Sequence, residues 1–134
     1  MAAIAATIGF ATVVAASRHF GSLSGTAYHA RLLYIEHIPP LFWPNEPFST
    51  DAWRQAPAEG RYRLVKSLLA GDHVLGRSRE QVGALLGTQV PRDAPQWLAP
   101  VRRVGFQNLW WVIVIEFEAG HAVTARRDLA WLDP

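Results

Sequence analysis

The segment EGRYRLVKSLLAG carries the clearest helical pattern of hydrophobic positions in the chain. Its apolar side chains recur at three- and four-residue spacing: Tyr62, Val65, Leu68 and Leu69. That spacing places them on one side of a helix and turns Arg61, Arg63 and Lys66 away from it. The pattern predicts an amphipathic helix over 59–70 that Gly71 ends.

The segment SREQVGALLG predicts a second helix with signals for its own start and end. The Ser78 hydroxyl can accept a hydrogen bond from the N–H of Gln81, and the Gln81 side chain can accept one from Ser78, which makes a capping box. The buried side of this helix is formed by Val82, Leu85 and Leu86. Gly87 suits the left-handed conformation that closes a helix, so every informative residue of the segment is interpreted as structural.

The C-terminal third has the two-residue period of a β-strand. One wholly apolar set alternates after Leu109: Trp111, Ile113, Ile115 and Phe117. The opposite set becomes acidic only at its end: Trp110, Val112, Val114, Glu116 and Glu118. Gly120 marks a hairpin loop, so residues 121–127 are predicted to return antiparallel. A further strand is predicted around 101–105, where Pro100 is more compatible with an edge than with a central position.

These elements predict an α+β domain over residues 58–134, with two helices packed on a three-stranded antiparallel β-meander. Residues 18–57 are expected to form a linker or strap. The aromatic side chains of its Pro-rich part are expected to pack onto the folded body in preference to forming a ligand surface: Phe42, Trp43, Phe48 and Trp53. Short helices are expected around Tyr28, Leu32 and Ile35, and from a cap at Ser49 or Thr50 towards Gln55.

The N-terminal run MAAIAATIGFATVVAAS has no charged side chain before Arg18. A spanning helix needs about 20 apolar residues, so this hydrophobic helix of residues 1–17 is predicted to be a signal-like segment or a marginal membrane anchor. Ala15, Ala16 and Ser17 offer a small-x-small cleavage site. A buried Ala-rich helix is the alternative. The favoured interpretation places the protein in the cell envelope, in the periplasm or anchored to the inner membrane through this segment.

Composition narrows the classes of function. The 134 residues are 50% hydrophobic and 18% charged, with six Trp, which favours one folded domain over a disordered chain. The net charge of +2 gives no broad basic face, so no nucleic-acid partner is expected. The absence of Cys excludes disulfides, thiolate metal sites, a cysteine nucleophile and a thioether lipid anchor.

Chemistry-bearing motifs are sparse. The histidines lack metal-ligand spacing, so neither a metal nor a cofactor is expected: His19, His29, His37, His73 and His121. There is no phosphate-binding loop and no nucleophile elbow. The chain is therefore predicted to be non-enzymatic. The alternative is a small enzyme with a polar site at the sheet end, formed by Glu116, Glu118 and His121.

A binding role is the favoured hypothesis, through the sheet face around Trp110 and Val112. Trp is favoured in binding hot spots, so Trp110→Ala is predicted to weaken partner capture without unfolding the domain. Four arginines can also form a basic patch for an acidic partner or lipid head groups, or else an ordinary solvated edge: Arg102, Arg103, Arg126 and Arg127.

The segment VLGRSREQVGALLGTQ, followed by a Trp-Leu pair and a meander with a Gly-centred hairpin, resembles the SmpA/OmlA family, also called BamE-like. The similarity covers about residues 59–127, and its motif positions are Leu75, Gly76, Ser78, Val82, Leu85, Leu86 and Gly87. The family consists of small periplasmic lipoproteins that support the outer-membrane β-barrel assembly machine, and its fold is shared with β-lactamase inhibitory proteins. The resemblance implies an interaction module whose partner is another envelope protein. This chain lacks the lipidated Cys of those lipoproteins.

Overall fold

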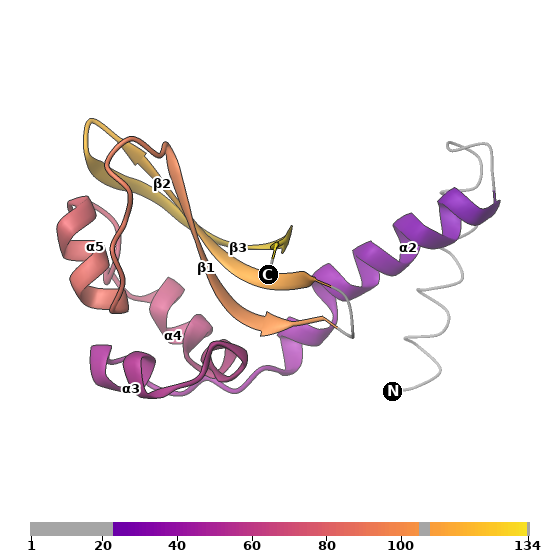
Figure 1. Ribbon diagram of the computed structural model, residues 1–134. Coiled ribbons are helices and arrows are strands. Elements are labelled where there is room, and N and C mark those ends of the chain that lie inside the picture. Colours follow the sequence, from indigo (N-terminus) through magenta and orange to yellow (C-terminus); the bar gives the residue numbers. More distant parts are fainter. Residues whose placement is uncertain (1–22, 105–107, 134) are drawn as a thin grey trace. The chain divides into compact units, whose positions relative to one another are not determined.

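The computed structural model describes residues 23–104 and 108–133 (Figure 1). The chain divides into two compact units with the boundary between Phe42 and Trp43. We call them the N-terminal unit and the sheet unit. This boundary lies inside the range 18–57 that the sequence assigned to a linker or strap. The expectations for residues 1–17 lie outside the described residues.

The N-terminal unit contains α2 (Leu23–His37) and the 3-10 helix η1 (Pro39–Phe42). The expected helix around Tyr28 is therefore present and is longer than its apolar spacing indicated. Its large apolar side chains remain substantially exposed at Tyr28, Leu33 and Tyr34. In the part of the chain that the structure describes, no helix has the length and apolar character needed to cross a membrane.

The sheet unit is α+β, as predicted, with its three described strands in the antiparallel order β1-β2-β3. Figure 1 shows its α-helices on one side of the curved sheet. Its helical segments include the predicted α3 (Thr50–Gln55) and α5 (Arg79–Leu86), and in place of one helix over 59–70 it has the 3-10 helix η2 (Ala58–Leu64) followed by α4 (Val65–Ala70). The strands are β1 (Gln96–Arg103), β2 (Leu109–Glu118) and β3 (His121–Trp131).

Helix α5 confirms the predicted capping signals. The N–H of Gln81 donates to Ser78 Oγ over 3.2 Å, and the N–H of Ser78 donates to Gln81 Oε1 over 2.9 Å. Gly87 closes the helix with φ of 67°. Helix α3 likewise begins at the predicted cap, because Ser49 Oγ accepts a hydrogen bond from the N–H of Ala52.

The single α-helix predicted over 59–70 is wrong in its first half, which is the 3-10 helix η2. The carbonyl of Arg63 accepts a hydrogen bond from the N–H of Glu46, over 3.1 Å. Lys66 Nζ donates to the backbone carbonyl of Trp43, and Ser67 Oγ donates to that of Glu46. Trp43 and Glu46 both belong to the Pro-rich strap that precedes α3. The strap therefore occupies the Arg63 carbonyl, a group that a continuous α-helix would use internally, and is also bound by two side chains of α4.

Aromatic residues of the strap join the core of the sheet unit. Trp53 is 0% exposed and Trp43 is also buried. The Trp43 ring lies edge-on to Trp111, with ring centroids 5.3 Å apart, and Phe48 lies 4.9 Å from the ring of His73. The expected packing of these strap aromatics is confirmed, whereas Phe42 belongs to the N-terminal unit and is exposed.

Strand β2 has the predicted bounds, and its apolar face is buried at Trp111, Ile113, Ile115 and Phe117. Strand β1 begins earlier than the predicted range 101–105, and it carries Pro100 on an outer strand, where the missing N–H costs no sheet hydrogen bond.

The start of β3 pairs with the turn that precedes α5. The N–H of Gly76 donates to the carbonyl of Ala122, and the N–H of Ala122 donates to the carbonyl of Arg77, each over 2.8 Å. An antiparallel bridge between Ser78 and His121 continues this pairing. This pairing therefore holds Ser78, the N-cap residue of α5, against the start of β3.

Candidate functional site

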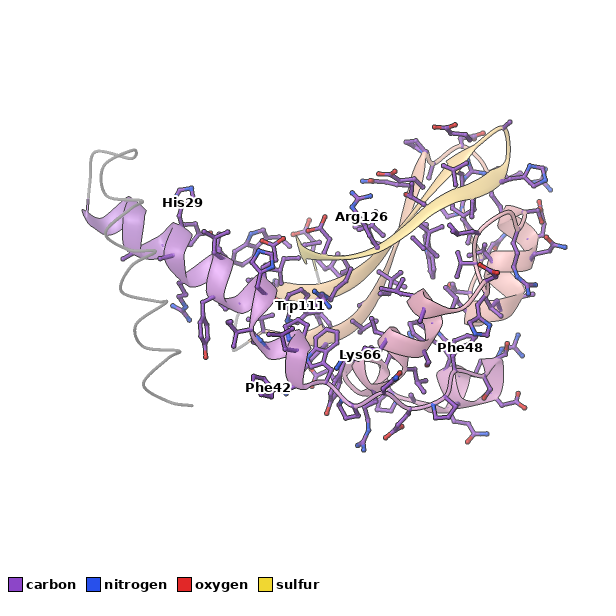
Figure 2. All side chains as sticks on the ribbon, turned by 180° about the vertical axis from the view of Figure 1, so that it is seen from behind. His29, Phe42, Phe48, Lys66, Trp111 and Arg126 are labelled. Carbon is purple, nitrogen blue, oxygen red and sulfur yellow. The ribbon has the colours of Figure 1, made fainter. Side chains whose placement is uncertain are left out.

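The four arginines considered as a candidate basic patch, with an ordinary solvated edge as the alternative, are distributed over both faces of the sheet. Arg102 and Arg103 lie in β1, Arg126 and Arg127 lie in β3, and the whole of β2 separates the two pairs. Arg102 and Arg127 stand opposite Trp111 and Ile113, whereas Arg103 and Arg126 stand opposite Trp110 and Val114. Consecutive strand residues point to opposite faces, so the four side chains do not form one patch. Figure 2 shows Trp111 and Arg126 on opposite sides of the sheet.

Two of these guanidinium groups lie over aromatic rings on the helix-covered face. The Arg102 guanidinium lies 4.3 Å from the centroid of the Tyr62 ring. The Arg127 guanidinium lies 5.4 Å from the ring of Trp111 and 5.8 Å from that of Trp43. Such cation–π contacts stabilise the fold and leave these arginines less available to a partner.

The predicted binding surface around Trp110 is smaller than expected. Trp110 is half-buried, and the Arg103 guanidinium lies 5.1 Å from its ring and 3.5 Å from Glu59. Val112 is 0% exposed. It stands in the central strand between Pro100 and Asp128 of the two outer strands. Val112 is therefore a core residue and offers no surface to a partner, which corrects the expectation of a binding role there.

The sheet end places two of its candidate catalytic groups, Glu118 and His121, opposite one another, whereas Glu116 is bonded to other residues. Glu116 accepts hydrogen bonds from Arg126 over 2.7 Å and from Thr124 over 2.8 Å, and these bonds hold its pKa below the ordinary value. Glu118 is exposed opposite His121, whose Nδ1 lies 3.1 Å from the carbonyl oxygen of Ala119. A carboxylate fixed in its ionised form is poorly suited to act as a general acid. Among residues 23–104 and 108–133, no three side chains gather in a potential metal site.

A groove of about 680 Å³ lies against α5 and the loop that follows it. We call it the arginine groove, and its charged and small lining residues include Arg54, Arg79, Glu80, Gly83, Thr88 and Arg92. The loop can approach α5 closely because Gly83 has no side chain. A Cβ atom at this position would lie 2.5 Å from the carbonyl oxygen of Thr88.

Two arginines of the groove are positioned by the backbone around them. Arg54 donates from Nη2 to the carbonyl of Ala84 over 2.6 Å, in the last turn of α5. Arg79 donates from Nη1 to the carbonyls of Pro91 and Ala94 in the following loop. A guanidinium carries five N–H donors, so these bonds fix each group in place and leave further donors for a ligand.

The balance of charge in the arginine groove is positive. Its lining includes three arginines and a single carboxylate, that of Glu80. Hydrogen bonds from the backbone N–H of Glu80 itself and from the Ser78 hydroxyl hold the pKa of Glu80 below its ordinary value. Glu80 therefore stays ionised at neutral pH and offsets one of the three positive charges.

A second pocket, of about 380 Å³, shares Gly87 and Thr88 with the arginine groove. We call it the Arg61 pocket, and its other walls are Arg61, Leu86 and the β1 residues Trp97, Leu98, Ala99 and Pro100. Partial burial lowers the pKa of Arg61. Within the described residues no carboxylate pairs with this guanidinium.

Sequence reasoning missed both sites, because their residues come from α3, η2, α5 and β1, far apart in the chain. The only local signal was the cluster of arginines on the polar side of the predicted helix over 59–70. Comparisons of the chain with models of protein families, with curated proteins and with solved structures found no match.

Proposed function

We propose that this protein is a non-enzymatic interaction module of the bacterial cell envelope, and that its sheet unit binds another envelope protein. The interaction part rests on one observation, the positively charged arginine groove, which shares Gly87 and Thr88 with the Arg61 pocket. The envelope part rests on the uncharged apolar run of residues 1–17 and on the resemblance of about residues 59–127 to the SmpA/OmlA family. Export to the periplasm and anchoring in the inner membrane both fit that run.

The chemistry of the groove favours binding over catalysis. Arginine stays protonated in proteins, so Arg54, Arg79 and Arg92 cannot exchange protons at neutral pH. The lowered pKa of Glu80 makes this carboxylate a weak base and keeps it from acting as an acid. What remains is a set of fixed guanidinium groups, which recognise carboxylates with defined geometry.

The partner is expected to present an acidic surface. Complementary charge accelerates association and selects among partners, and this contribution falls as salt rises. Arg92 and Thr88 are exposed in the loop after α5, where a partner can reach them. The solvent-exposed position of the groove fits a protein surface better than a small buried metabolite.

Site-specific photo-crosslinking in a Gram-negative host tests the interaction. A benzophenone amino acid replaces Gln89, an exposed residue of the groove, and in a matched control it replaces Gln55, which is exposed in α3. The expected result is a discrete adduct with an envelope protein from position 89, reduced by Arg92→Glu. Equal adducts from both positions, or none from position 89, would contradict the proposal. A third probe at Trp110 tests the sheet surface, and an adduct from it alone would move the interface there.

Intact mass and membrane fractionation test the envelope part. Loss of residues 1–17 with a periplasmic product means export, and a full-length product in the inner-membrane fraction means anchoring. A full-length product in the cytoplasmic fraction would contradict the envelope location. That outcome would not decide whether the sheet unit binds a partner, which the crosslinking tests.

A further inference from the structure

The outer edge of β1 has an unpaired position beside Arg61. The N–H of Phe117 donates to the carbonyl of Pro95 over 2.9 Å, which marks the 95/117 pair as hydrogen-bonded. Hydrogen-bonded and non-hydrogen-bonded pairs alternate in an antiparallel ladder. In the regular register up to Pro100, Trp97 and Ala99 therefore bond to β2, and Leu98 directs its N–H and C=O away from β2.

The Arg61 pocket follows this edge. Four consecutive residues of β1 line it, from Trp97 to Pro100. Their side chains point alternately to opposite faces of the sheet, so a space that contacts all four lies along the edge of the strand. Unpaired groups at a strand edge are a template for an added strand.

Only a short part of this edge can pair with an added strand. Pro100 has no N–H to offer, and the ladder shifts register between Pro100 and Arg102. Both features discourage a long added strand. Only Leu98, in the part of the edge that lines the pocket, offers both a donor and an acceptor.

The Arg61 guanidinium has spare donors at this edge. Its Nε donates to the carbonyl of Trp53 over a long 3.4 Å, and the group lies 5.1 Å from the Trp53 ring. No acceptor among the described residues engages its two terminal nitrogens. The lowered pKa reflects the loss of water around this group without a compensating carboxylate.

We infer that the Arg61 pocket binds the carboxyl-terminal end of an extended peptide, which pairs its backbone with Leu98 and places its terminal carboxylate on the Arg61 guanidinium. This inference rests on the proposed function, because it names the part of a partner that would enter the site. Arg61 lines the same pocket as Leu98 and Pro100, and the capacity of the outer edge to pair with an added strand ends at Pro100. A chain that ends there needs no further backbone partners. The apolar walls at Leu86, Trp97 and Pro100 suit apolar side chains of the peptide.

The test titrates the isotope-labelled full chain, held in detergent micelles, with the probe peptide acetyl-Thr-Val-Thr-Val. The probe is compared as the free carboxylate and as the carboxyl-terminal amide. The readouts are the NMR shift of the Leu98 backbone N–H, its rate of hydrogen exchange, and the shift of the Arg61 side-chain Nε–H. We expect the carboxylate probe to move both signals and to slow exchange at Leu98. Removal of the charge should weaken binding about tenfold, as the loss of one charged hydrogen-bonded pair.

Variants assign the effect to one arginine. Arg61→Gln should weaken the carboxylate probe about tenfold and leave the amide probe unchanged. Arg63→Gln is the matched control, because Arg63 is an arginine of the same 3-10 helix that pairs with Glu46. Equal loss from both variants would overturn the inference. A peptide with an internal Glu and an amidated end separates a side-chain carboxylate from a terminal one, and tighter binding of that peptide would also overturn it.

Inorganic phosphate is the remaining comparison. One contrary result is that phosphate and the probe peptide both shift the NMR signal of the Arg61 Nε–H without changing that of the Leu98 backbone N–H. This result would mean a simple anion site and would overturn peptide binding. The result is separable from the crosslinking at Gln89. A partner adduct without probe binding leaves the proposed function and removes this inference, whereas probe binding without an adduct does the reverse.

Discussion

Helices α4 and α5 follow one another in the chain but are held in place by different means. Helix α5 has a reciprocal cap at Ser78 and Gln81 and a left-handed Gly87 at its end. Helix α4 has no side-chain cap at its start, where it continues from the 3-10 helix η2, and its C-cap Gly71 is extended. The ends of α5 are therefore specified locally, whereas those of α4 depend on the rest of the fold.

The strap supplies what α4 lacks. Ser67 and Lys66, both in α4, donate to backbone carbonyls at Glu46 and Trp43. The strap in turn needs α4, because its part-buried carbonyls at Glu46 and Trp43 would lose these donors without it, and an unsatisfied acceptor costs free energy. The difference between the two helices shows that adjacent segments of a small domain can rely on local or on tertiary signals.

The largest expected effect is loss of the packing that holds α4. Leu68 is 1% exposed, and Leu68→Ala should lower the free energy of unfolding by about 3 kcal/mol. Urea denaturation followed by tryptophan fluorescence measures it. The matched control is Leu69→Ala in the same helix, where the side chain is only half-buried and the loss should be smaller. Equal losses would mean that α4 is not held by its buried side.

Gly83→Ala tests the contact of α5 with its following loop. The new Cβ would meet the Thr88 carbonyl at 2.5 Å, so we expect a loss of about 2 kcal/mol in unfolding free energy. Gly60→Ala is the control, because its Cβ would meet Pro57 at an ordinary 3.4 Å. Helix propensity alone would make Gly83→Ala stabilising by about 1 kcal/mol. A measured gain would therefore refute the close approach.

Ser78→Ala and Ser67→Ala compare the two kinds of support directly. Each should cost about 1 kcal/mol, the first through a lost cap and the second through a lost tertiary hydrogen bond. Hydrogen exchange separates them. Exchange should rise only in the first turn of α5 for Ser78→Ala, but in both α4 and the strap around Glu46 for Ser67→Ala. If faster exchange in Ser67→Ala were confined to α4, it would contradict the coupling between α4 and the strap.

The smallest expected effect comes from the ion pair between Arg63 and Glu46. Its side chains are 51% and 45% exposed, so Glu46→Gln should change the free energy of unfolding by no more than about 0.5 kcal/mol. Denaturation at low and high salt checks this, and the small difference should vanish in high salt. A large loss would mean that the strap is held by charge as well as by its backbone.

These contrasts explain which parts of the fold were predictable. The bounds of α5 and β2 follow from neighbouring residues, through a capping box in one and ten residues of apolar alternation in the other. The start of α4 was not predictable, because the Arg63 carbonyl is bonded to Glu46, which no local pattern indicates. Strand β1 was predicted too short, because Pro100 interrupts the alternation of QWLAPVRR.

The candidate site was less predictable than the fold. The four strand arginines form two pairs of neighbours in the sequence. Within each pair the side chains point to opposite faces of the sheet, and β2 separates one pair from the other. Arg61, Thr88 and Leu98 become neighbours only when η2, α5 and β1 pack together. In the sequence Arg61 is only a polar position of a predicted helix, and no local pattern indicates the unpaired strand edge that lines its pocket.

The pairing of Gly76 and Arg77 with Ala122 sets an order on folding during synthesis. The capping signals of α5 lie within one short segment, so all of them are present as soon as this segment leaves the ribosome. The turn before it must wait for the start of β3, which is made much later, and contacts between distant residues form slowly because a long loop has to close first. A nascent chain that stops short of His121 has made α5 but has nothing to pair with that turn. The domain is completed only when the last hairpin arrives, so its folding has to wait until β3 has been synthesised.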